Sequence, residues 1–206
     1  MRYVLIVLLV LVCSVASVAA QVSVGIGLPS VNIGINLPVL PQLVPVPGYP
    51  VYYAPAVAAN YFFYDGMYWV YQADNWYASS WYNGPWGLVD PLAVPVHLLR
   101  TPVRFYRQPP VYWQSWRRDA PPHWGERWGH DWAQRRSGWN RADHHPAPAA
   151  APLPRYQAPY SRGRYPRPEQ QQAIQRREYR YQPREPVVQQ HYQRQQERGR
   201  GRGHHG

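Results

Sequence analysis

Proline and glycine restrict the fold of this chain more than any other feature. The sequence has 24 prolines and 15 glycines among its 206 residues, and each proline inside a helix removes a hydrogen bond and clashes with the preceding turn. A long helical bundle is therefore excluded. The length allows one ordinary domain with extensions, and the 10 Trp, 18 Tyr and 3 Phe rule out a purely polar, disordered chain.

The N-terminus has the three-part layout of a secretory signal peptide. Arg2 supplies a positive start, residues 4–12 are an unbroken apolar run, and small residues lead to Ala20 and then to the polar Gln21. This order predicts a signal peptide over residues 1–20, cleaved after Ala20; a retained membrane anchor is the alternative. We therefore expect an exported protein, located in the periplasm or outer envelope or secreted.

The single cysteine, Cys13, lies inside this apolar run. Cleavage after Ala20 would leave a chain without cysteine in a compartment that permits disulfides. A thiol nucleophile, a zinc–cysteine site and a redox pair are then excluded, and the stability of the mature chain must come from packing.

Charge divides the sequence into two halves. Residues 21–99 contain no Arg or Lys and three acidic residues, whereas residues 100–206 contain 21 arginines and eight acidic residues. This asymmetry predicts a near-neutral folded part and a cationic part for an anionic partner. The absence of lysine is also explained by the codon usage of a GC-rich genome.

Residues 21–48 begin with a nine-residue repeat, in which the segment 22–29 returns as 31–38. Apolar residues alternate with small or polar ones in both copies, which is typical of half-buried strands. We expect edge strands or an extended linker over residues 21–48.

Residues 49–140 are predicted to form an aromatic-rich folded module. Fifteen aromatic residues lie between Tyr49 and Trp86, and Asp65-Gly66 separates two such runs, which is a strong hairpin signal. A second turn at residues 73–75 predicts an antiparallel meander of three or four strands. Both faces of its strands are apolar, so the second face must be covered by the downstream Arg- and Trp-rich segment, by a partner or by a ligand.

The second part of this module is predicted to contain short strands over residues 94–99 and 103–106 and a helix from Pro121 to about Arg136. Three tryptophans recur every four residues along one stripe of this helix, at Trp124, Trp128 and Trp132. We expect the stripe to dock onto the aromatic sheet; an amphipathic helix on a membrane is the alternative. The fold class is thus mainly β with a short helix, followed by a long tail.

Residues 141–206 are rich in Pro, Gln, Arg and Gly and predict a disordered tail with a marginal helix near residues 169–180. Arg-Gly repeats with interleaved tyrosines suit nucleic acid, but export makes an anionic envelope polymer or lipid surface the more favourable partner. A merely solubilising tail stays an alternative. The residues predicted to contact this partner are Arg117, Arg118, Arg135, Arg136, Arg198, Arg200 and Arg202.

The segment Trp81-Tyr-Asn-Gly-Pro-Trp86 fits a Trp-x-x-Gly-x-Trp motif. Together with the aromatic run from Tyr61 and the stretch from Arg117 to Trp139, it resembles a set of small exported proteobacterial envelope proteins with Trp–Gly repeats. This chain has one clean copy of the motif, where a tandem array is typical. The resemblance covers residues 50–140 and implies an envelope location.

No complete catalytic signature is present, and we expect a protein that is not an enzyme and has no cofactor. Asp65 and Asp74 fall at predicted turns, where aspartate is favoured for backbone reasons. His123, Glu126 and His130 share a face of the predicted helix and are weak candidates for binding a metal such as zinc, copper or nickel. The spacing of a closed metal site is missing, so solvated side chains are the favoured interpretation.

Two hypotheses of function follow, with low-affinity metal binding through histidines as a third. The first is a structural or adaptor protein of the envelope, whose Arg-rich tail contacts anionic material. The second is a carbohydrate-binding module that offers a ring platform and uses Asp74, Asn75 or Asn83 to bind sugar hydroxyls. The rings of that platform would be Trp69, Trp76, Trp81 and Trp86.

Overall fold

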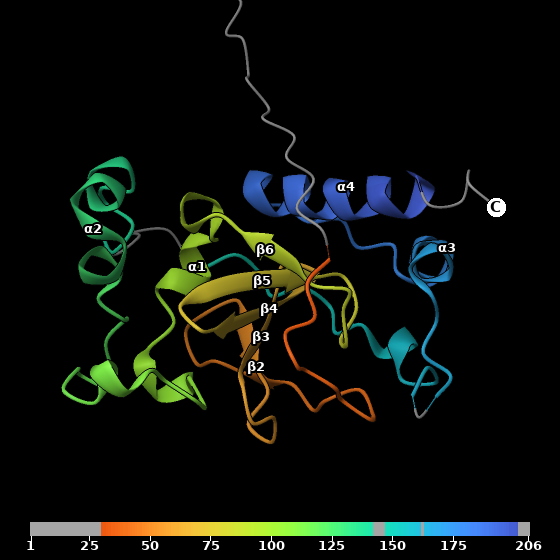
Figure 1. Cartoon of the computed structure of the whole chain (residues 1–206), viewed down its shortest axis with the longest axis horizontal. Coiled ribbons are helices and arrows are strands. Elements are labelled where there is room, and N and C mark those ends of the chain that lie inside the picture. Colours follow the sequence, from red (N-terminus) through yellow and green to blue (C-terminus); the bar gives the residue numbers. More distant parts are fainter. Residues whose placement is uncertain (1–29, 142–146, 162, 202–206) are drawn as a thin grey trace, which may run out of the picture.

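A six-stranded antiparallel sheet forms the centre of the computed structural model, which describes residues 30–141, 147–161 and 163–201. Its strands are β1 (Val44–Pro45), β2 (Val51–Tyr53), β3 (Asn60–Tyr64), β4 (Met67–Gln72), β5 (Asn75–Ser79) and β6 (Gly87–Val89). They pair in sequence order as a meander (Figure 1). The predicted antiparallel meander is confirmed, and it extends to six strands. The expected signal peptide and the first copy of the repeat lie outside the described residues.

Two tight turns define the register of the central strands. Asp65 and Gly66 have φ angles of 48° and 82°, and Tyr64 pairs with Met67 on either side of them. Such paired positive φ angles match the twist of the flanking strands. The second turn has the same form, with φ of 47° at Ala73 and 61° at Asp74. Both hairpins were predicted from the sequence, and both are confirmed.

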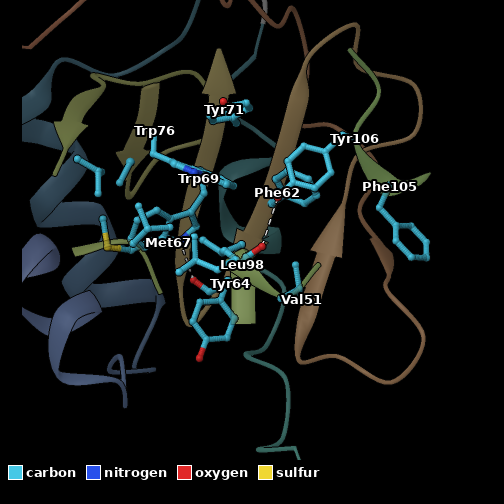
Figure 2. Close-up of a cluster of buried hydrophobic side chains, with 14 of the residues drawn as sticks. Val51, Phe62, Tyr64, Met67, Trp69, Tyr71, Trp76, Leu98, Phe105 and Tyr106 are labelled. Atoms are coloured by element: carbon cyan, nitrogen blue, oxygen red, sulfur yellow. Dashed lines mark hydrogen bonds between the residues drawn. The ribbon is translucent and has the colours of Figure 1, made fainter. Parts of the chain in front are cut away.

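Both faces of the sheet are buried, because aromatic residues occupy both sides of each central strand. On the first face lie Phe62, Trp69 and Trp76, each at most 1% exposed (Figure 2). On the second face lie Phe63 and Tyr68, both fully buried. The expectation that the second face needs a cover therefore applies, and the chain supplies that cover itself.

Four α-helices and four short 3₁₀ turns surround the sheet. They are η1 (Pro91–Ala93), α1 (Val96–Leu99), η2 (Val103–Phe105), η3 (Val111–Trp113), α2 (Trp124–Arg135), η4 (Arg155–Gln157), α3 (Pro168–Glu178) and α4 (Pro186–Gly201). In the described residues, more positions lie in helices than in strands, so "mainly β" describes the core better than the whole. None of these helices is long and apolar enough to cross a membrane.

The strands predicted over residues 94–99 and 103–106 are wrong. These segments form α1 and η2, each of which begins directly after a proline, Pro95 or Pro102. A proline fixes φ and provides no N–H for a strand ladder. The side chains of both segments reach the core, since Leu98, Leu99 and Phe105 pack on the first face.

Helix α2 confirms the predicted Trp-bearing helix and its docking onto the sheet. The ring of Trp124 is fully buried and lies 5.2 Å from the ring of Tyr71 on β4. The ring of Trp128 stacks on that of Trp124 with centroids 4.6 Å apart, and the centroids of Trp128 and Trp132 are 4.8 Å apart. Gly129 interrupts the helix with φ 82° and ψ 179°, so the three rings line two short helical pieces.

The second face is covered from both ends of the chain. The second copy of the repeat forms no strand beyond a single bridge between Val31 and Trp86, which agrees with the linker alternative. Ile33 is buried there. Ala151 and the partly buried Tyr165, from the C-terminal part, join the same cluster.

The structure revises the extent of the expected disordered tail. Helices α3 and α4 pack together, and α4 contacts β5 along the top edge in Figure 1. Val188 and Tyr192 of α4 are buried in the first core cluster. The short helix expected near residues 169–180 is present as α3. Tyrosine and glutamine side chains, which composition counts as polar, supply this packing; residues 202–206 lie outside the described part.

Candidate functional site

The predicted sugar-stacking platform is not at the surface. Trp69 and Trp81 are fully buried, Trp76 is 1% exposed and Trp86 is 3% exposed. The first face holds Trp69 and Trp76, whereas Trp86 lies in the cluster of the second face. Trp69 and Trp76 lie on strands whose two faces are covered, and Trp81 and Trp86, outside the named strands, are buried as well, so none of the four rings offers a surface to a sugar.

The polar residues of that hypothesis bond within the chain. Asn83 accepts the N–H of Leu37 at 2.8 Å, and Asn75 donates to the carbonyl of Ala73 at 2.7 Å. Asp74 accepts the hydroxyls of Tyr71 and Tyr112. These three side chains stabilise turns and loops of the chain.

The weak metal candidates are not assembled into a site. His123 Nδ1 lies 2.9 Å from Glu126 Oε1, and the His123 ring stacks on Trp116 with centroids 4.5 Å apart. His130 is exposed on the far side of the Gly129 interruption. Within residues 30–141, 147–161 and 163–201, no group of three His, Cys, Asp or Glu side chains could hold a metal ion.

The acidic residues considered for catalysis serve the backbone. Asp90 accepts the N–H of Leu92 and caps η1. Asp65 is 5% exposed and accepts the hydroxyl of Tyr181 and the N–H groups of Arg184 and Glu185. Both oxygens of Asp65 and one oxygen of Asp90 therefore accept donors that fold the chain.

Sequence reasoning missed Glu185, which lines a cavity of about 350 Å³ with Asp65 and His97. Burial raises the pKa of the Glu185 carboxyl, and donors such as the Tyr64 hydroxyl, at 2.8 Å, oppose the shift. The available signal was its position directly before Pro186, at the start of α4, where an acidic residue is favourable. Its bonds make it a clamp between β3 and α4.

The most exposed apolar surface of the described chain is carried by residues 107–118, which we name the 107–118 loop. Val111 is 77% exposed, and its neighbour Tyr112 is 46% exposed. Trp116 is half-buried. The sequence Pro-Pro-Val-Tyr-Trp places apolar groups at the tip, since two consecutive prolines cannot join a strand or a helix interior there.

A buried tryptophan fixes this loop to the sheet. Trp113 is 2% exposed, stacks on Tyr71 of β4 at 5.4 Å, and meets Trp124 of α2 edge-on at the same distance. Trp116 stacks on the outer side of Trp113 at 5.0 Å. A column of rings therefore runs from the core to the surface, with His123 at its exposed end.

Hydrogen bonds hold the two ends of the loop. Asn60 of β3 accepts the N–H of Gln108 and donates to its carbonyl, both at 2.7 Å. At the other end, the N–H of Arg104 donates to the carbonyl of Arg118 at 2.9 Å, and Val103 bonds to Ala120. The segment is a closed surface loop with a fixed base.

Arginine side chains are spread over the surface outside the sheet. Ion pairs within the described part of the chain include Arg104 with Asp119, Arg127 with Asp74, and Arg177 with Glu178. Among the described residues, the exposed arginines that form no such ion pair are Arg107, Arg117, Arg118, Arg135, Arg141, Arg155, Arg164, Arg167, Arg176, Arg180, Arg184 and Arg194.

The arginines predicted as contacts fall into three groups. Arg117, Arg118 and Arg135 are exposed, as the prediction requires. Arg136 is half-buried and donates to the Val94 carbonyl at 2.8 Å, so it fastens α2 to η1. The remaining three are at the C-terminus: the last turns of α4 carry Arg198 and Arg200, of which only the backbone is described, and Arg202 lies outside the described residues.

Comparison of the chain with protein-family models, with curated proteins and with solved structures gave no match.

Proposed function

We propose that this chain is a non-enzymatic, exported protein of the cell envelope, which acts as a structural or adaptor element by binding anionic envelope material. The observation that carries the proposal is the set of exposed arginines without carboxylate partners in the described chain. A guanidinium binds phosphate or carboxylate with two parallel hydrogen bonds, and these arginines are available for such bonds.

The structure changes how this binding would work. Residues 163–197 pack around the neutral sheet, so their arginines sit on a folded shell, and the flexible arm expected from the sequence is not required. A folded shell keeps its cations at fixed positions, which lowers the entropy lost when a polymer or surface is bound. The central sheet is the scaffold, and its cationic cover is the binding surface.

Two further observations support a binding role. The carboxylates of Asp65 and Glu185 accept hydrogen bonds that hold α4 to the sheet, so these two acids serve the fold. The apolar run of residues 4–12 and the small residues before Gln21 predict export. Export would bring the arginines to envelope phosphates and acidic polysaccharides.

The test is a pull-down of the purified protein with isolated envelope fractions at low and at high salt. We expect retention at low salt and release at high salt, because exposed charge pairs are screened over about 10 Å at 0.1 M. Replacing Arg176 of α3 and Arg180, which follows α3, by Gln, together with Arg117 and Arg118, should weaken retention severalfold.

The matched control is Glu178→Gln, which removes a negative charge from the same helix and should strengthen retention. Circular dichroism should show that all variants stay folded, since the replaced side chains are exposed. Retention that is insensitive to salt and to the four substitutions would overturn the proposal.

A further inference from the structure

We propose that the 107–118 loop inserts its tip into the headgroup region of an anionic lipid surface. This inference rests on the proposed function and names lipid as the anionic material that this surface contacts. It is carried by three features of the loop: an exposed apolar tip, a rigid base and flanking cations without acidic partners.

The apolar tip suits a lipid surface better than a hydrated polymer. Val111 is the most exposed large hydrophobic residue in the described chain, and Tyr112 is next. A polysaccharide leaves such an aliphatic side chain in water, whereas the acyl boundary of a bilayer removes it from water. Tyr112 and Trp116 are residue types that favour the interface between headgroups and hydrocarbon.

The rigid base makes insertion of the tip more favourable. Trp113 anchors the middle of the loop between Tyr71 and Trp124, and Asn60 holds Gln108 by two hydrogen bonds. The tip therefore projects in one conformation, so little conformational entropy is lost when a surface binds it.

Charge determines that the lipid is anionic. Arg107 lies before the tip, and Arg117 and Arg118 lie after it; all three are exposed and form no ion pair among the described residues. Two of the neighbouring acids are paired with arginines, Asp119 with Arg104 and Asp74 with Arg127, and a third, Glu126, bonds to His123. Lipid phosphates attract such flanking arginines.

Polar residues limit the depth of insertion. Gln108 and Gln114 are exposed on either side of the tip, and their amides would lose hydrogen bonds in hydrocarbon. The loop is therefore a shallow anchor that holds the folded protein against one leaflet.

The experiment uses the protein as recovered from expressing cells, with its N-terminus determined by mass spectrometry and the same form used for every variant. Vesicles of pure phosphatidylcholine are compared with vesicles containing 30% phosphatidylglycerol, by co-sedimentation. We expect at least tenfold preference for the anionic vesicles. Val111→Asp and the pair Arg117→Gln, Arg118→Gln should each weaken this binding about tenfold.

Val39→Asp is the matched control, because Val39 is 45% exposed and has no arginine nearby in sequence; its vesicle binding should equal that of the wild type. A dye attached at position 111 reports on the loop itself, so residues 4–12 do not contribute to its signal. In a Cys13→Ser background, an environment-sensitive dye on Val111→Cys should shift to the blue and be quenched by spin-labelled lipid, whereas the dye on Val39→Cys should not.

Soluble dextran sulfate separates this inference from the proposed function. If the inference holds, Val111→Asp weakens vesicle binding more than it weakens dextran sulfate binding. Its loss of vesicle binding also exceeds that of Val39→Asp, which adds the same charge elsewhere. The lipid inference would be overturned if Val111→Asp left vesicle binding unchanged and vesicles left the signal of the dye at position 111 unchanged. The proposed function would still stand if dextran sulfate bound in a salt-dependent way. Failure to bind either probe or envelope fractions would overturn both.

Discussion

The carboxylate of Asp65 accepts the backbone N–H of Glu185 at 2.8 Å, although 120 positions separate the two residues. The same carboxylate accepts the N–H of Arg184 at 2.8 Å and the hydroxyl of Tyr181 at 2.6 Å. Since α4 begins at Pro186, a turn residue of the central hairpin binds the two residues that lead into the last helix, a contact that we name the cap. This contact joins the neutral sheet to its cationic cover.

Removing this cap should destabilise the protein. We expect Asp65→Gly to lower the free energy of unfolding by about 2–3 kcal/mol, because the hydrogen bonds to a buried carboxylate are lost. Glycine keeps the positive φ of the turn, so the effect reports the cap. Urea unfolding and hydrogen exchange of the α4 amides are the measurements.

Asp65→Asn is the control for this prediction, since asparagine also tolerates the turn and keeps one oxygen acceptor. Its loss of stability should be about half as large. If glycine and asparagine gave the same stability and the same protection of α4, the capping role would be refuted.

The sequence predicted the turn at Asp65 but not the contact of its carboxylate with Glu185. The hairpin was predictable, because Asp65-Gly66 is a local turn signal. The cap was not, because it depends on where a segment 120 residues later returns to the sheet. Only the order Glu185-Pro186 indicated that a helix begins there.

Gln157 holds the C-terminal cover to the second face of the sheet. It is fully buried, and its Oε1 accepts the Tyr68 hydroxyl and the Tyr82 N–H, both at 3.1 Å. Its Nε2 donates to the Ser80 carbonyl at 2.9 Å and to Tyr156 at 2.8 Å. We expect Gln157→Ala to lower the free energy of unfolding by about 2–4 kcal/mol, because buried partners are left unpaired.

Chemical denaturation of Gln157→Ala should be compared with that of Gln134→Ala. Gln134 is exposed on α2, and surface substitutions usually change stability by less than about 0.5 kcal/mol. Equal midpoints for the two variants would show that residues 147–161 contribute little to the fold, as a disordered tail would.

Glutamine also explains why the cover was hard to predict. Gln157, Gln171 and Gln175 are each at most 4% exposed, whereas a composition count treats glutamine as solvated. The same ambiguity applies to the tryptophans, since a ring row on a strand suits either a core or a sugar platform. The sequence indicated that both faces needed a cover, but not which residues would provide it.

Gly129 and Gly125 form a matched pair on α2. Gly129 has φ 82° and ψ 179° with open space around an added Cβ, whereas Gly125 is helical and an added Cβ would meet Ala133 at 3.4 Å. We expect Gly129→Ala to destabilise the protein by about 1–3 kcal/mol, because only glycine adopts that backbone region readily. Gly125→Ala should be neutral or stabilising by up to about 1 kcal/mol.

Thermal unfolding followed by circular dichroism distinguishes the two glycine variants. A Gly129→Ala variant that is as stable as Gly125→Ala would mean that α2 is a continuous helix. By intrinsic propensity both glycines weaken a helix equally, so the sequence does not show which of them interrupts α2.

Buried tyrosines should make the protein sensitive to alkali. Burial raises the pKa of Tyr61, Tyr68 and Tyr106 well above the ordinary value of 10.0. The folded state therefore retains these protons after the unfolded chain has released them. The stability that these tyrosines contribute is fully present below pH 10. It falls as the pH rises above 10, by about 1.4 kcal/mol per pH unit for each such tyrosine.

Tyrosinate absorbance at 295 nm should rise in two steps, and the second should coincide with loss of the far-ultraviolet circular dichroism signal. Tyr68→Phe removes one of these groups, so its free energy of unfolding should fall less steeply above pH 10 by about the same 1.4 kcal/mol per pH unit. A single smooth rise in absorbance with unchanged circular dichroism would mean that these hydroxyls reach solvent in the folded state, and the sheet would then lack its second cover.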